Sequence, residues 1–184
     1  MDFQAYLSQF EQILTATNPK EPYNDPDFFE YTKLNYSRTK RWLKTGRLNE
    51  ETVAAVKGIT KAQTWIIITE PWCGDAAHSV PFIEMIGKEN PLITTTYELR
   101  DSEPFRIESY LTNGSKSIPK LVIKDENGED LAVWGPRPEE CQAFFQKFID
   151  DKADLDTMKE ALQIWYNQDK GNSIQREITN LIQS

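Results

Sequence analysis

The sequence predicts an α/β protein with a mixed central sheet, and three observations lead to this fold class. The β-branched run Thr64–Thr69 has the composition of a strand that is buried on both faces. Strand and helix patterns then alternate through the middle of the chain. An Asn127-Gly128 turn between two apolar runs predicts a closing β-hairpin. This order of elements places helices on both faces of the sheet.

The first part of the chain, residues 1–57, is expected to be a helical extension. Its first helix is indicated by apolar residues at helical spacing, which are Phe3, Leu7, Phe10 and Leu14. A proline-rich break over residues 18–26 ends that helix. A second helix is expected over Glu30–Lys44, and Asn49 is placed to cap a third over Glu50–Lys57.

The middle part, residues 58–150, carries the predicted sheet. After the first strand, a helix with a kink at Pro81 leads to a second strand, a further helix, the hairpin and a last helix. The expected bounds are Asp75–Lys88 (helix), Leu92–Leu99 (strand), Glu103–Thr112 (helix), Leu121–Ile123 and Leu131–Trp134 (hairpin strands) and Pro138–Asp150 (helix).

The last part, residues 151–184, is expected to form two more helices. Lys170-Gly171-Asn172 stops the first, and Ser173 is placed to cap the second. Both helices have apolar stripes, which are Leu155, Met158, Leu162 and Trp165 in one and Ile174, Ile178, Leu181 and Ile182 in the other. The stripes are expected to pack on the sheet domain, with a homodimer seam as the alternative.

Composition excludes several classes of protein. The 184 residues are 39% hydrophobic and 27% charged, as in ordinary soluble domains. A formal net charge of -8 argues against nucleic acid or an anionic membrane as partner. No segment approaches the roughly 18 apolar residues of a membrane span, and the N-terminus lacks the basic start of a signal peptide. We therefore expect a cytoplasmic protein whose two cysteines are free thiols.

The segment Trp72-Cys73-Gly74-Asp75-Ala76, followed by Pro81, resembles the active site of the thioredoxin family. That family has Trp-Cys-Gly-Pro-Cys with a proline five residues after the second cysteine. Ser117-Ile118-Pro119-Lys120 resembles its Ile-Pro element before the hairpin, and Gly135 resembles a glycine near its substrate groove. The resemblance covers about half of the chain, and the helical flanks are similar to a bacterial branch of thioredoxin-like proteins.

The resemblance implies a thioredoxin-like fold with a cis Ile118–Pro119 bond that faces the active cysteine. It implies Cys73 as the catalytic residue. It also implies a substrate groove formed by Trp72, Gly74, Asp75, Ala76, Ile118, Pro119, Trp134, Gly135 and Arg137.

Two residues depart from the family pattern. Ala76 stands where thioredoxins have the resolving cysteine, and Ile67 stands where they have a buried aspartate. Cys73 is expected to be accessible at a helix N-terminus, where backbone N–H groups favour its thiolate and the charge of Asp75 opposes it. It would form a mixed disulfide that only an external thiol resolves. The implied function is a single-cysteine thiol–disulfide oxidoreductase, and the alternative is a protein- or peptide-binding module.

The remaining chemically active side chains have simpler interpretations. Cys141 falls on an apolar helix face and is interpreted as a small buried hydrophobic residue. His78 lies about 140° around a helix from Cys73 and is interpreted as a helix-surface or second-layer residue. Arg137 would either stabilise a thiolate or substrate carboxylate, or only belong to a rigid Pro-Arg-Pro helix start. No metal or cofactor is expected. The expected partner is a small thiol or a protein bearing a thiol or disulfide.

One basic cluster lies in the N-terminal part. It consists of Lys33, Arg38, Lys40, Arg41, Lys44 and Arg47. A solvated helix surface is the first interpretation, and a docking face for an acidic partner is the alternative.

Overall fold

A mixed four-stranded sheet forms the centre of the computed structural model, which describes residues 1–184. Strand β1 (Gln63–Thr69) pairs in parallel with β2 (Ile93–Leu99) and antiparallel with β3 (Lys120–Lys124). Strand β4 (Asp130–Trp134) pairs antiparallel with β3, so that the order is β2-β1-β3-β4. The predicted α/β class, mixed sheet and hairpin are confirmed.

The connection between β2 and β3 differs from the prediction. In place of a helix over Glu103–Thr112, the chain forms one 3₁₀ turn, η1 (Arg106–Ser109), and then a loop. Two local features shorten the helix. Pro104 disfavours helical backbone at the residue before it, and Phe105 has a positive φ of 52° that interrupts a right-handed helix.

The N-terminal extension consists of α1 (Phe3–Thr15), α2 (Pro26–Thr45) and α3 (Glu50–Lys57). Helix α2 begins four residues before the predicted start, because the Asp25 carboxylate caps it and Pro26 occupies its first turn. The Asn49 side chain accepts the Thr52 N–H at 2.8 Å, as expected for the cap of α3.

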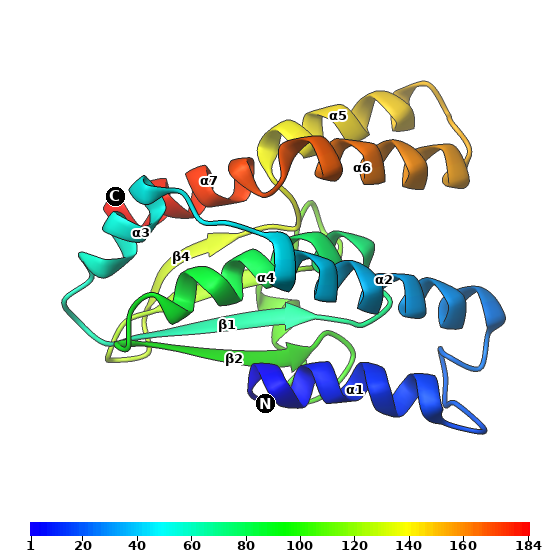
Figure 1. The fold of residues 1–184 in the computed structure, drawn as a ribbon, viewed down its shortest axis with the longest axis horizontal. Helices are drawn as coiled ribbons and strands as arrows, with labels where there is room; N and C mark the ends of the chain where they lie inside the picture. Colours follow the sequence, from blue (N-terminus) through cyan, green and yellow to red (C-terminus); the bar gives the residue numbers. More distant parts are fainter.

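The C-terminal half adds α5 (Glu139–Asp150), α6 (Leu155–Asp169) and α7 (Asn172–Gln183) after the long helix α4 (Gly74–Lys88) of the sheet domain. Helices α5 and α6 lie side by side, and α7 lies beside α3 (Figure 1). The predicted cap at Ser173 is wrong. Its N–H donates to the Asp169 carboxylate, and Gly171 at φ 80° begins α7. None of the seven helices is long and apolar enough to cross a membrane.

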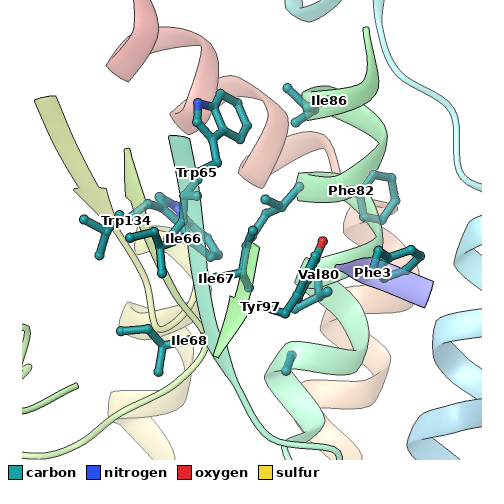
Figure 2. Close-up of a cluster of buried hydrophobic side chains, with 14 of the residues drawn as sticks. Phe3, Trp65, Ile66, Ile67, Ile68, Val80, Phe82, Ile86, Tyr97 and Trp134 are labelled. Atoms are coloured by element: carbon teal, nitrogen blue, oxygen red, sulfur yellow. The ribbon is translucent and has the colours of Figure 1, made fainter. Parts of the chain in front are cut away.

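The core lies between β1 and α4 and extends into both terminal parts. Figure 2 shows Ile67 of β1 pointing toward Val80 of α4, with Ile66 and Ile68 on the other side of the strand. The extensions contribute buried side chains to this same cluster, which are Phe3, Tyr6, Phe10, Ile174 and Ile178. Helices α1 and α7 are therefore parts of the folded core, whereas Leu155 of the predicted α6 stripe is 62% exposed.

Candidate functional site

Cys73 lies at the point where the chain leaves β1 and enters α4. It is the N-cap of α4, and its Sγ accepts the Ala76 N–H at 3.4 Å. The thiol donates to the Ile118 carbonyl, also at 3.4 Å. The Ile118–Pro119 bond is cis, as the motif predicts. Cys73 and the cis-proline loop thus face each other.

The expectation of an accessible Cys73 is wrong. The residue is only 7% exposed, because α4 and the Ile118 loop enclose its sulfur. Burial raises the pKa of the Cys73 thiol to about 12, and the neighbouring Asp75 carboxylate adds to the increase. Hydrogen bonding from the Ala76 N–H and the charge of Arg137 lower this pKa, but by less. Cys73 is therefore a neutral thiol at pH 7.

Asp75, two residues after the cysteine, is held by two side chains from the C-terminal half. It forms an ion pair with Arg137 and accepts the Tyr166 hydroxyl at 2.7 Å. Both side chains of the ion pair are largely buried, at 11% and 13% exposed. Of the predicted roles for Arg137, the structure shows carboxylate binding, but the carboxylate belongs to this chain. A buried pair of this kind fixes the geometry of the loop beside Cys73.

A groove of about 840 Å³ opens in front of Cys73. Its floor is the loop at the start of α4, and both helical extensions contribute to its walls. From α2 come Phe28 and Tyr31, and from the α5–α6 pair come Phe145, Leu155 and Lys159. The volume is within the usual range for small-ligand sites, roughly 300–1,000 Å³. The extensions thus enclose a site that the sheet domain alone would leave more open.

Six of the ten predicted site residues line this groove, namely Trp72, Cys73, Gly74, Asp75, Ile118 and Arg137. The other four do not. Ala76 has no exposed surface, and Pro119 is buried behind Ile118. Trp134 is turned toward α7, where its Nε1 donates to Glu177 at 2.6 Å. Gly135 lies with Trp134 at a separate hollow, and its backbone closely approaches the Pro119 carbonyl.

Sequence reasoning missed the residues that cover the active-site loop. Phe28 packs edge-on against Trp72 with ring centroids 6.0 Å apart, and Arg100 lies over the same indole at 4.6 Å. The Tyr31 hydroxyl lies so close to Gly74 that any side chain there would collide with it. No signal in the sequence connects α2 with this loop, because an amphipathic helix shows only that it packs somewhere.

His78 and Cys141 are both buried and lie behind the site. The Trp42 Nε1 donates to His78 Nδ1 at 2.9 Å, and the imidazole stacks on Tyr166 at 4.4 Å. Cys141 is a free thiol with no exposed surface. No three His, Cys, Asp or Glu side chains gather closely enough to hold a metal ion. These residues support the site from within the core.

We predict that His78 makes the fold sensitive to acid. Burial lowers its pKa from 6.5 to about 3, with a smaller contribution from the charges of Arg38 and Arg41. Because the folded pKa is depressed, the stability it provides is present above pH 6.5 and is lost as the pH falls toward 3. His78→Asn keeps an acceptor for Trp42 but does not titrate. Between pH 7 and 5 the wild type should lose about 2 kcal/mol relative to this variant.

Urea unfolding of both proteins at several pH values measures this difference. The comparison is needed because burial raises the pKa of Glu70 to about 7, which changes stability in the opposite direction over the same range. The contribution of Glu70 to the pH dependence is the same in both proteins and cancels in the comparison. Parallel pH profiles for the two proteins would contradict the prediction.

Residues 24–159 match the family described as Thioredoxin. No curated protein matches the chain. The crystal structure of an HIV epitope scaffold is similar over 99% of this chain and 92% of its own, with a TM-score of 0.60 and 13% identity. The crystal structure of a protein of unknown function from Pseudomonas aeruginosa is similar over 93% of this chain and 92% of its own, with a TM-score of 0.53 and 14% identity. Both likenesses concern the fold alone. Since the family match spans most of its length, this chain belongs to the thioredoxin family.

Proposed function

We propose that this protein captures a disulfide-bearing partner at Cys73 as a mixed disulfide, and that an external thiol releases it. The observation that carries the proposal is the position of the Cys73 sulfur. It caps α4, faces the Ile118 carbonyl and lines the floor of the groove. A partner sulfur in the groove would approach the one thiol on its lining.

The exchange has two steps. Cys73 gives up its proton to solvent, and its sulfur attacks one sulfur of the partner disulfide, so that one S–S bond forms and another breaks. The departing thiolate takes up a proton. The Ala76 N–H already points at the Cys73 sulfur and stabilises the charge during attack. An external thiolate then attacks the partner's sulfur in the mixed disulfide and forms a new S–S bond with it. The Cys73 thiolate leaves and takes up a proton.

The loop beside the groove supports an extended peptide as the partner. Neither the Ser117 nor the Ile118 N–H donates a hydrogen bond within the chain. Backbone N–H groups that are free beside a sheet can pair with an added strand. Aromatic side chains at the other wall, Phe28, Tyr31 and Trp72, supply apolar contact. A disulfide-bearing peptide or a small peptide thiol fits this combination.

Binding without exchange is the second candidate, and the burial of Cys73 favours it. With a pKa of about 12, roughly one thiol in 100,000 is ionised at pH 7. The groove could then hold a peptide while the thiol serves only as a hydrogen-bonding group. Asp75 is held in place by Arg137 and Tyr166, and the rigid loop that results suits a binding surface as well as it suits an exchange site.

Oxidised glutathione, a small disulfide-bearing peptide, separates the two candidates. Exchange predicts an adduct of one glutathione per chain at Cys73, removed by added thiol, absent in Cys73→Ser and retained in Cys141→Ala. Intact mass and peptide mapping detect it. Since the resting thiol is protonated, the adduct should form about tenfold faster for each unit of pH above neutrality. Calorimetric binding to both wild type and Cys73→Ser with no adduct would instead favour the binding module.

A further inference from the structure

The C-terminal end of α2 carries a concentration of positive charge with no counter-charge. Eleven ion pairs engage eleven of the 21 Lys and Arg residues of the chain. Five of the others fall within ten residues, which are Arg38, Lys40, Arg41, Lys44 and Arg47. In a chain with 29 acidic residues and a net charge of -8, so many basic side chains without an ion pair in one place are unexpected. Something other than this chain's own carboxylates would neutralise them.

A concave site lies within this charged region. A hollow of about 540 Å³ opens between the end of α2, the end of α6 and the start of α7. We call it the α2–α7 hollow. Its lining contains three cationic side chains and no acidic one, and consists of Arg41, Trp42, Thr45, Gly46, Arg47, Asn167, Lys170 and Asn172. It shares no residue with the groove at Cys73. The volume is that of a small-molecule site.

The cations of the hollow are oriented by neutral partners. The Arg41 Nη2 donates to the Asn167 side chain at 2.7 Å, and its guanidinium lies 4.5 Å from the centre of the Trp42 ring. Arg47 donates through Nη1 to the Gly46 carbonyl at 2.7 Å, which leaves its other nitrogen donors available. These contacts hold two guanidinium groups at the hollow without removing their charge.

The acidic residue next to Lys170 in the sequence is already engaged. Asp169 precedes Lys170, but its carboxylate accepts the Ser173 N–H at 3.0 Å and the Ser173 hydroxyl at 2.6 Å. It therefore serves the junction of α6 and α7 and forms no ion pair with Lys170. Arg41 in turn has a lowered pKa, because of burial and the neighbouring Arg38. Like charges are crowded here, and an anion would relieve their repulsion.

We propose that the α2–α7 hollow binds a small polyanion that carries phosphate groups. Guanidinium groups form paired hydrogen bonds with phosphate oxygens, and a lysine adds a mobile charge. The amides of Asn167 and Asn172 and the hydroxyl of Thr45 offer neutral donors on the same lining. The concave shape, with three cations on its lining, fits a compact ligand better than an extended acidic surface.

Tripolyphosphate is the probe, and calorimetry on the full chain at low salt is the measurement. Arg41→Gln with Lys170→Gln should weaken binding by about tenfold or more. The double variant Lys147→Gln with Lys152→Gln is the matched control. Lys147, like Arg41, is an exposed cation on a helix. Lys152, like Lys170, has a positive φ, of 54° against 53°. The control should bind within about twofold of wild type.

Three results would overturn the proposal. These are no binding of tripolyphosphate at about 10 mM, equal weakening in the two double variants, or equal affinity for citrate, a polyanion without phosphate. Thermal unfolding of each variant without ligand checks that the fold is intact. Cys73 and its groove are unchanged in both variants, so the result is independent of the exchange reaction.

Discussion

Asp75→Asn should make Cys73 react faster with iodoacetamide, and Arg137→Gln should make it react more slowly. Both substitutions break the same buried ion pair. The first removes a negative charge that raises the Cys73 pKa, and leaves the positive charge of Arg137 to lower it. The second leaves the Asp75 charge without its partner. Wild-type Cys73 should itself be at least about tenfold slower than free cysteine at pH 8.

The opposite signs make the test specific. Each variant should lose about 3–5 kcal/mol of stability, because one member of a buried pair is left without its partner. If faster alkylation came only from loosening of the fold, both variants would react faster. Peptide mapping after timed alkylation separates Cys73 from Cys141, and urea unfolding gives the stabilities. An equal increase in the reactivity of both variants would contradict the electrostatic explanation.

Gly135→Ala should be the most damaging single-methyl change beside the site. Gly135 has a φ of 109°, a region that residues with a side chain rarely adopt. A β-carbon there would collide with the Pro119 carbonyl, which is backbone and cannot turn aside. We expect a loss of about 3 kcal/mol or more in the free energy of unfolding. The shifted Pro119 would also displace the Ile118 carbonyl from Cys73 and reduce the glutathione adduct.

Gly128→Ala is the control for this prediction. Gly128 also has a positive φ, of 83°, but nothing lies within 4 Å of the added carbon. It should lose only the cost of backbone strain, about 1–2 kcal/mol. The difference between the two variants in the free energy of unfolding, measured with urea, therefore gives the cost of the collision with Pro119. Equal losses would show that the Gly135 backbone moves freely away from Pro119.

Periodicity and turn chemistry were sufficient to predict most of the elements. The strand at Thr64–Thr69 and the helix at Glu50–Lys57 lie within a residue of the structure, because β-branched runs and a capped amphipathic segment are local signals. The failure at Glu103–Thr112 arose from Pro104, a signal that the sequence does contain, and from the positive φ of Phe105, which composition does not reveal. The cis bond at Pro119 followed from the motif and not from periodicity.

The candidate site was predictable in position but not in environment. The motif placed Cys73 at the start of a helix, where it lies. Its environment depends on residues distant in sequence, such as Ile118 at its sulfur, Tyr31 over Gly74 and Tyr166 on Asp75. Contacts of this kind form only when amphipathic helices pack in the tertiary structure. The local sequence of a helix shows which face is apolar but not which surface that face packs against. The raised pKa of Cys73 has the same origin.

The hydrogen bond from Tyr166 to Asp75 has a consequence for local unfolding. It joins the last turn of α6 to the first turn of α4, across 91 residues of sequence. Detachment of α6 would therefore break this bond and also remove one wall from the groove. The C-terminal helices and the start of α4 should then open as one cooperative unit. Amide hydrogen exchange would show the two segments losing protection together, at a free energy below that of global unfolding.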